Sequence, residues 1–191
     1  MPSTDCLCVA LFAPGSVDAE VGRLQASIFA EHGIASAHAV PPLVPIGFVR
    51  DLAAAREGPL SEPREARTFL AAVERSVGAP WRAVVASQRW HEGFLFLSVE
   101  SGALWAQARE ALRARIAEPG FFPAVEGFFL GCGDATDAQR ASIRCELPRL
   151  SFSSATIALV RFSSPFDAAG YWREVRWETL AEQPLRGRRA T

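Results

Sequence analysis

A strand–helix–strand pattern that occurs twice is the feature that most constrains the fold of this 191-residue chain. The first copy runs from an apolar strand at 7–12 through a helix to a strand at 43–49. The second starts at 94–99, continues through a helix and an insertion, and ends in a strand at 156–162. Such halves usually face each other across a pseudo-twofold axis, with a groove between their sheets. We therefore predict an α+β fold with two pseudo-symmetric lobes, each a small, mainly antiparallel sheet with helices packed outside, around a central groove.

Apolar periodicity and capping residues predict the remaining elements. Helical spacing indicates helices over 17–32, 62–77, 101–116 and 134–145, and apolar or alternating runs indicate strands over 81–86, 127–130 and 171–179. Ser101 and Asp134 have side chains that commonly cap helix N-termini. We expect residues 1–181 to form a single bilobal domain and the polar residues 182–191 to form a flexible tail.

The composition limits the class of protein. Hydrophobic residues make up 49% of the chain, with 13 Phe and 5 Trp, so the core can be substantial. No run of about 18 apolar residues is present, and residues 1–5 lack the basic start of a secretory signal. We therefore expect a cytoplasmic protein with no membrane span. The formal net charge of −1 predicts no electrostatic attraction of the whole molecule to nucleic acid.

The cysteines do not match a metal-binding pattern. Cys6 and Cys8 are two residues apart on a predicted strand, a geometry that disfavours a disulfide between them. Their spacing from Cys132 and Cys145 matches no established zinc motif. We therefore predict buried free thiols, with no metal and no cofactor.

Three strands carry a resemblance to a known family. They are the opening strand at 6–12, the strand that follows Pro41–Pro42, and the late strand at 156–162. With the first helix, this layout resembles the 2H phosphoesterase superfamily over most of the chain. That superfamily includes the bacterial 2′-5′ RNA ligase-like proteins and cyclic phosphodiesterases. Its two motif strands typically read Pro-Pro-His-x-Thr-Leu and His-x-Thr-Leu-x-Arg.

The chemistry of that family depends on two histidines carried by strands. Residues i and i+2 of a strand share a face, so each motif projects an imidazole and a hydroxyl together, one imidazole acting as base and the other as acid. Carried over by position, the first motif falls on Leu43 and Pro45. The second falls on Thr156 and Ala158. None of these side chains is an imidazole, so the resemblance implies groove-lining residues without the two-histidine mechanism and no catalytic residue.

Three other residues are possible contacts for an anion or a ligand. His91 lies in the run Arg89–Trp90–His91–Glu92, which is also the composition of an ordinary polar turn. Arg161 occupies the place of the arginine that ends the second family motif. Ser154 shares a strand face with Thr156 and offers a hydroxyl.

The sequence is compatible with three functions. The one we favour is a non-catalytic 2H phosphoesterase-like protein whose groove binds a nucleotide, an RNA end or another small ligand. The second is a structural or protein-interaction domain whose groove is filled by side chains. The third is a phosphoesterase that uses residues outside the family pattern, such as His91, Ser154 and Arg161.

Overall fold

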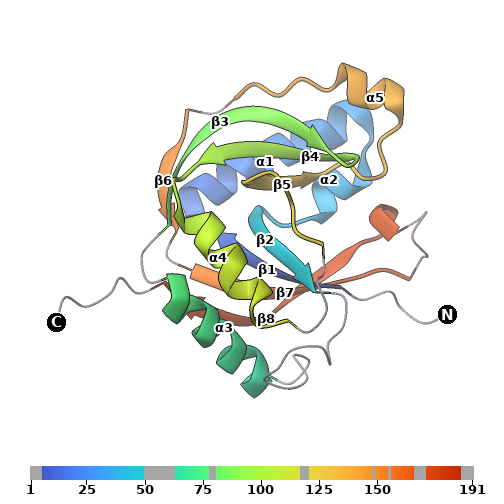
Figure 1. The fold of residues 1–191 in the computed structure, drawn as a ribbon. Coiled ribbons are helices and arrows are strands. Elements are labelled where there is room, and N and C mark those ends of the chain that lie inside the picture. The colour runs from blue at the N-terminus through green and yellow to red at the C-terminus, as the bar shows by residue number, and fades with distance from the viewer. Residues whose placement is uncertain are drawn as a thin grey trace.

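The architecture consists of two stacked antiparallel sheets with helices on their outer faces (Figure 1). The computed structural model describes residues 6–49, 63–77, 81–116, 121–147, 149–154, 156–165 and 171–185. The strands are β1 (Cys6–Phe12), β2 (Leu43–Val49), β3 (Trp81–His91), β4 (Phe94–Glu100), β5 (Gly127–Gly131), β6 (Ser151–Ser154), β7 (Thr156–Ser163) and β8 (Arg176–Pro184). The helices are α1 (Gly15–His32), α2 (Ala35–Ala39), α3 (Pro63–Val77), α4 (Leu104–Arg113), α5 (Asp137–Ser142) and a 3-10 helix, η1 (Tyr171–Arg173).

Each sheet contains four strands. The first sheet has the order β2-β1-β7-β8, and the second has the order β5-β4-β3-β6. All neighbouring strands within the described ranges are antiparallel. We call the face of each sheet that is turned towards the other sheet its inner face. This arrangement confirms the predicted α+β fold with two lobes.

The central strand β1 explains why the first sheet carries near-continuous apolar runs. Leu7, Val9 and Leu11 are buried in the core on the outer face of the sheet. The alternating residues Cys8 and Ala10 are buried on the inner face. Because both faces of a central strand are covered, the alternation of apolar and polar residues disappears.

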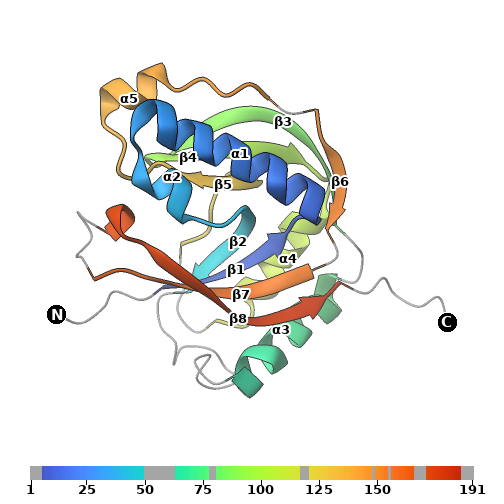
Figure 2. The same ribbon diagram turned by 180° about the vertical axis from the view of Figure 1, so that it is seen from behind.

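The helices cross over between the lobes. α3 and α4 contact each other and pack against β8, β7 and β2 of the first sheet. α1 lies across the outer face of the second sheet, although it connects two strands of the first (Figure 2). Gln25 of α1 is buried and donates a hydrogen bond from Nε2 to the carbonyl oxygen of Phe129 in β5, at 3.4 Å. Within the described ranges, none of the helices has the length and hydropathy needed to cross a membrane.

The strands that correspond to each other in the two copies of the repeat differ from those that the sequence indicated. In the first copy, β1 pairs with β2, and in the second copy, β4 pairs with β5. The counterpart of β2 is therefore β5 and not β7, which lies beside β1 in the first sheet. The prediction that the second copy ends with the strand at 156–162 is wrong. The apolar run of β7 concealed the relation, because burial on both faces gives any central strand this signature.

Two predicted helix caps form hydrogen bonds elsewhere. Asp134 accepts a hydrogen bond from the hydroxyl of Ser36, and the cap of α5 is Thr136. Ser101 donates its hydroxyl to Glu126, and α4 has no side-chain cap. Both polar side chains therefore connect elements that are distant in the sequence.

The C-terminal strand also differs from the prediction. The 3-10 helix at Tyr171–Arg173 replaces the start of the strand expected from 171, and β8 continues to Pro184. Leu185, which follows β8, is only 5% exposed. The segment predicted as a tail from 182 therefore starts as paired strand, and residues 186–191 lie outside the described part of the chain.

Candidate functional site in the groove between the sheets

Apolar side chains from both sheets occupy the groove between the inner faces. We call this set the groove cluster. Its buried members are Cys8, Ala10, Val40, Leu43, Phe96, Val125, Phe129, Ala158, Val160, Phe162, Tyr171 and Val175, and half-buried residues packed against it include Cys6, Phe12, Phe48, Phe94 and Trp172. The centre of the groove is therefore lined mainly by hydrocarbon and aromatic rings.

The four predicted groove residues lie on one sheet. Leu43 and Thr156 pair with the same residue of β1, and Pro45 and Ala158 pair with another residue two positions earlier. These pairings place them in two adjacent rows on the inner face of the first sheet. Leu43 and Ala158 are fully buried in the groove cluster. β2 and β7 therefore approach the groove from the same side, and the predicted opposition of these two motif strands is not formed.

The strand that meets β2 across the groove is β5. The rings of Phe48 and Phe129 are in edge-to-face contact there, with centroids 6.4 Å apart. On β5, Phe129 pairs with Phe96 and Gly127 pairs with Ser98, so Gly127 and Phe129 hold the inner-face positions. A second histidine-and-hydroxyl pair opposite β2 would have to occupy such positions. Neither residue transfers a proton or donates a side-chain hydrogen bond.

Sequence reasoning missed the β5 positions, although a signal was present. β5 is the next strand after α4, just as β2 is the next strand after α1 and α2. The packing at Gly127 explains its identity, because a Cβ there would lie 2.5 Å from the carbonyl oxygen of Leu97 and 2.8 Å from Cα of Ser98. This close approach of β4 leaves no room for a catalytic side chain at Gly127.

An open hollow of about 180 Å³ is present within the groove. We call it the aromatic hollow, and its lining residues are Cys6, Phe48, Phe94, Phe96, Phe121, Phe129 and Trp172. The rings of Phe94 and Trp172 lie 4.9 Å apart between centroids, and those of Phe129 and Trp172 lie 5.3 Å apart, both edge to face. Among the described residues that line it, none carries a charge. The hollow can accept apolar or planar groups but offers an anion no counter-charge.

Backbone packing holds two of these rings in place. A Cβ at Gly133 would lie 2.5 Å from Cε1 of Phe94 and 2.7 Å from Cδ1 of Trp172, so both rings rest directly on the glycine backbone. Tyr171 packs edge to face on Trp172, with centroids 5.1 Å apart. The hydroxyl of Tyr171 lies 3.6 Å from Sγ of Cys6. The rings are thus positioned before any ligand arrives.

A second, more polar hollow of about 310 Å³ lies on the second sheet. We call it the polar hollow, and its lining residues are Ala86, Ser87, Arg89, Ser98, Val99, Glu100, Trp105, Ala124 and Glu126. Arg89 pairs with Phe96 across β3 and β4, and Ser87 pairs with Ser98 in the next row. The hydroxyl oxygens of the two serines lie 2.7 Å apart. Because directly paired residues share a sheet face, the two hollows adjoin on one inner face.

Glu126 is a partly buried carboxyl group in the polar hollow. Burial raises its pKa, and hydrogen bonds donated by the Ser101 hydroxyl and the Trp81 indole lower it again in part. The indole Nε1 lies 2.9 Å from Oε1 of Glu126. These donors orient the carboxyl group between β3 and the start of α4.

The other predicted contacts fall in different places. His91 pairs with Phe94, so it lies on the inner face beside the aromatic hollow, and its Nε2 is 4.0 Å from Oε1 of Glu92. Arg161 alternates with inner-face residues of β7 and forms an ion pair with Glu178 on β8. Arg161 therefore lies on the face of β7 that is turned away from the groove. Ser154 ends β6, an edge strand of the second sheet, whereas Thr156 begins β7 of the first sheet.

The four cysteines are free thiols, as predicted, but the expected burial holds for only two of them. Cys8 and Cys132 are buried, whereas Cys6 and Cys145 are half-buried. Burial raises the pKa of Cys8 well above its ordinary value, raises that of Cys132 to about 12 and raises that of Cys145 to about 11. Within the described ranges, no group of three or more His, Cys, Asp or Glu side chains is arranged to hold a metal ion.

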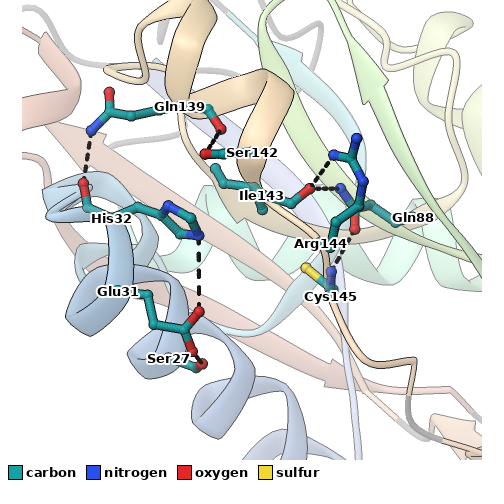
Figure 3. A network of polar contacts seen from close by, with 9 residues as sticks. All are labelled: Ser27, Glu31, His32, Gln88, Gln139, Ser142, Ile143, Arg144 and Cys145. Carbon is teal, nitrogen blue, oxygen red and sulfur yellow. Dashed lines mark hydrogen bonds and ion pairs between the residues drawn. The ribbon is translucent and has the colours of Figure 1, made fainter.

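A polar network on the outside of the second sheet has a structural role (Figure 3). Gln139 of α5 donates to the carbonyl oxygen of His32 at 2.7 Å. Gln88 of β3 donates to the carbonyl oxygen of Ile143 at 3.1 Å and accepts from the backbone N–H of Cys145 at 2.8 Å. These bonds fasten the segment after β5 to α1 and β3, on the face opposite the groove.

Comparison with known proteins supports the fold. No protein-family model matches the sequence, and no curated protein sequence matches it either. Among solved structures, TT0787 of Thermus thermophilus superposes with a TM-score of 0.60 at 18% identity, over 96% of this chain and 100% of that one. Escherichia coli LigT in its apo form gives a TM-score of 0.59 at 16% identity, over 97% and 99% of the two chains. A protein described as a phosphoesterase gives 0.56 at 17% identity, over 95% and 99%.

These similarities extend over nearly the whole chain. LigT has also been crystallised with 3′-AMP, NADP+, ATP and phosphate. At this level of identity the comparison establishes a shared fold.

Proposed function

We propose that this protein is a non-catalytic 2H phosphoesterase-like protein whose groove binds a nucleotide, an RNA end or another small ligand. The observation that carries this proposal is the content of the two edge strands that meet at the groove. Leu43 and Pro45 of β2 and Gly127 and Phe129 of β5 occupy the inner-face positions there. None of these side chains can act as a general acid or base, and none has a hydroxyl to bind a phosphoryl oxygen.

The open aromatic hollow favours binding over a purely structural role. A groove that served only as a core would be closed, because protein interiors are packed with few voids larger than a water molecule. Here about 180 Å³ stays open among the rings. The complexes of LigT with 3′-AMP, ATP and NADP+ support nucleotides as the first ligands to test.

Two measurements on the purified protein test this proposal together. In the first, 2′,3′-cyclic nucleotides and 2′-5′-linked oligonucleotides are incubated with the protein, and an active member of the 2H phosphoesterase family serves as positive control. We expect no turnover above the buffer blank. In the second, isothermal titration calorimetry with AMP, ATP, NADP+ and nucleosides detects binding, which we expect for at least one of them.

For each measurement, one outcome would contradict the proposal. Turnover that is abolished by His91→Ala would overturn the non-catalytic assignment, because His91 lies beside the aromatic hollow. Absence of binding by every compound in the panel would favour the structural alternative, in which the groove cluster serves as a second core.

A further inference from the structure

We propose that the ligand presents an uncharged planar system of one or two rings that carries a hydroxyl-bearing substituent. The ring system occupies the aromatic hollow, and the substituent extends into the polar hollow against Ser98 and Arg89. This inference rests on the proposed function, because it names the chemical class of the ligand for the same groove.

The size of the aromatic hollow sets the size of the ring system. An apolar protein cavity of about 150 Å³ is known to bind a single benzene ring. The aromatic hollow encloses about 180 Å³ and is open to solvent, so it accommodates one ring or two fused rings. Trp172 is in edge-to-face contact with Phe94 and with Phe129, so the rings around the hollow lie in different planes. A flat ligand can therefore stack on one ring and contact another ring with its edge.

Charge complementarity determines what the ring system carries. The lining residues of the aromatic hollow consist of one cysteine, five phenylalanines and one tryptophan. A charged group transferred from water into such surroundings loses its hydration without gaining a partner. A matching ring system is therefore neutral, and its polar atoms face the open side of the hollow.

Residues of β3 and β4 next to the aromatic hollow determine the direction of the substituent. Phe96 lines the aromatic hollow and Ser98 lines the polar hollow. They are two residues apart on the inner face of β4, a separation of about 7 Å along a strand. Arg89 lies on β3, pairs with Phe96 of β4 and also lines the polar hollow. A substituent the length of one sugar therefore spans the two hollows.

The mixture of charges in the polar hollow favours hydroxyl groups over a phosphate. The Arg89 guanidinium can donate hydrogen bonds there, and the carboxyl groups of Glu100 and Glu126 can accept them. The Ser98 hydroxyl donates to the carbonyl oxygen of Ser87 at 2.9 Å, so towards a ligand it acts as an acceptor. Hydroxyl groups both donate and accept, so they suit this combination. A phosphate acts mainly as an acceptor at neutral pH and would be repelled by an ionised carboxylate.

Matched compounds measured by isothermal titration calorimetry test the inference. Adenine and adenosine differ by the sugar, indole and tryptophol differ by a hydroxyl arm, and adenosine and AMP differ by the charge. We expect the hydroxyl-bearing member of at least one of the first two pairs to bind severalfold more tightly than its bare ring. We also expect AMP to bind no more tightly than adenosine, and 10 mM inorganic phosphate, roughly ten times a typical weak Kd, to leave adenosine binding unchanged.

Two variants with matched controls locate the site. Trp172→Leu removes a wall of the aromatic hollow and should weaken all ring ligands about tenfold, since stacking on one aromatic side chain is worth that much. Trp177→Leu, on an exposed part of β8, should leave affinity unchanged. Arg89→Gln should weaken adenosine or tryptophol about fivefold and the bare rings not at all. Arg67→Gln, on an exposed position of α3, is its control. Circular dichroism melting curves verify that each variant is folded.

Three outcomes would overturn the inference. Binding of AMP at least tenfold tighter than adenosine, with competition by phosphate, would show that an anion is the anchor and would leave the proposed ligand-binding function intact. Equal loss of affinity in Trp172→Leu and Trp177→Leu would place the ligand outside the aromatic hollow. Absence of binding by adenine, adenosine, indole, tryptophol and AMP would reject the inference and the proposed function together.

Discussion

At the residue scale, Gly127 and Phe129 have packing roles in the groove. Both lie on the inner face of β5, opposite β2. Gly127 allows the backbone of β4 to approach closely, and Phe129 contributes a ring to the aromatic hollow. A histidine at either position would disturb a structure that is built around a missing side chain or a large ring.

The close approach at Gly127 can be tested by adding a single methyl group. We expect Gly127→Ala to lower the free energy of unfolding by roughly 1–3 kcal/mol, because the new Cβ overlaps the carbonyl oxygen of Leu97. Gly22→Ala in α1 is the matched control, since a Cβ there meets nothing within 4 Å. That change should raise stability by up to about 1 kcal/mol through helix propensity. Urea denaturation measures both, and a neutral Gly127→Ala would contradict the packing described here.

Glu126 predicts a pH dependence of stability whose sign follows from the direction of its shift. Its pKa is raised in the folded state above the ordinary value of 4.5, so the native protein binds the proton more tightly than the unfolded chain does. Stability contributed by this group is present below pH 4.5 and is lost as pH rises through the folded pKa.

We expect Glu126→Gln to remove this component of the pH dependence. The amide oxygen of glutamine still accepts hydrogen bonds from Trp81 and Ser101, so the fold is retained. The difference in thermal stability should shift in favour of the variant as pH increases from 4 to 7, a range chosen to span roughly the expected titration of a raised glutamic acid. A difference that is constant with pH would mean that the carboxyl group is not shifted.

At the scale of elements, short segments after β5 depend on side-chain capping rather than on core burial. α5 has only six residues and none of them is buried. Its N-terminus is held by a capping box in which Thr136 and Gln139 bond each other's backbone N–H groups. Gln139 also reaches the carbonyl oxygen of His32, so the same side chain joins α5 to α1 (Figure 3).

Removing the cap should therefore weaken this element and its attachment. We expect Thr136→Ala to cost about 1 kcal/mol of stability, and Thr136→Ser, which keeps the hydroxyl, to cost clearly less. Hydrogen–deuterium exchange should show faster exchange within α5 and in the segment up to Cys145 for the alanine variant, with the sheets unchanged. Identical exchange in the alanine and serine variants would argue against the cap as the cause of order here.

The elements also show what could be predicted from the sequence. β1, α1, β2 and the two-lobed arrangement follow from apolar periodicity, because those residues alternate between two covered faces. The strand that faces β2 across the groove could not be predicted in the same way. β7 has the longer apolar run, whereas β5 is short and bounded by Gly127 and Gly131. Contact between strands of different sheets depends on tertiary packing, which local patterns do not report.

The predicted site residues beside the groove are four on the first sheet and His91 on the second. Leu43 and Ala158 lie in the groove cluster, as their positions on apolar strands suggested. Arg161 was expected near the groove because the sequence pattern does not show which face of the sheet an arginine at the end of a strand occupies. Its ion-pair partner Glu178 lies on β8, the strand that follows β7 in the chain. The rings of the aromatic hollow come from five separate segments, so no single stretch of sequence indicates them.

At the scale of the whole molecule, the two lobes are interlocked. α1 follows β1 of the first sheet but covers the second sheet. α4 follows β4 of the second sheet but packs against β2 of the first. The two sheets are thereby held together around the groove, with an aromatic hollow and a polar hollow adjoining on one inner face. The fold shared with LigT and TT0787 thus places a groove lined mainly by apolar and aromatic side chains between the two sheets.

The most direct test of ligand binding in the groove is a crystal structure of the protein with adenosine or tryptophol. We expect electron density for the ring system between Phe94, Phe129 and Trp172, with its hydroxyl-bearing arm directed towards Ser98 and Arg89. Density for the ring system outside the groove, or a groove closed by side chains with no ligand in it, would show that the groove does not bind such a ligand.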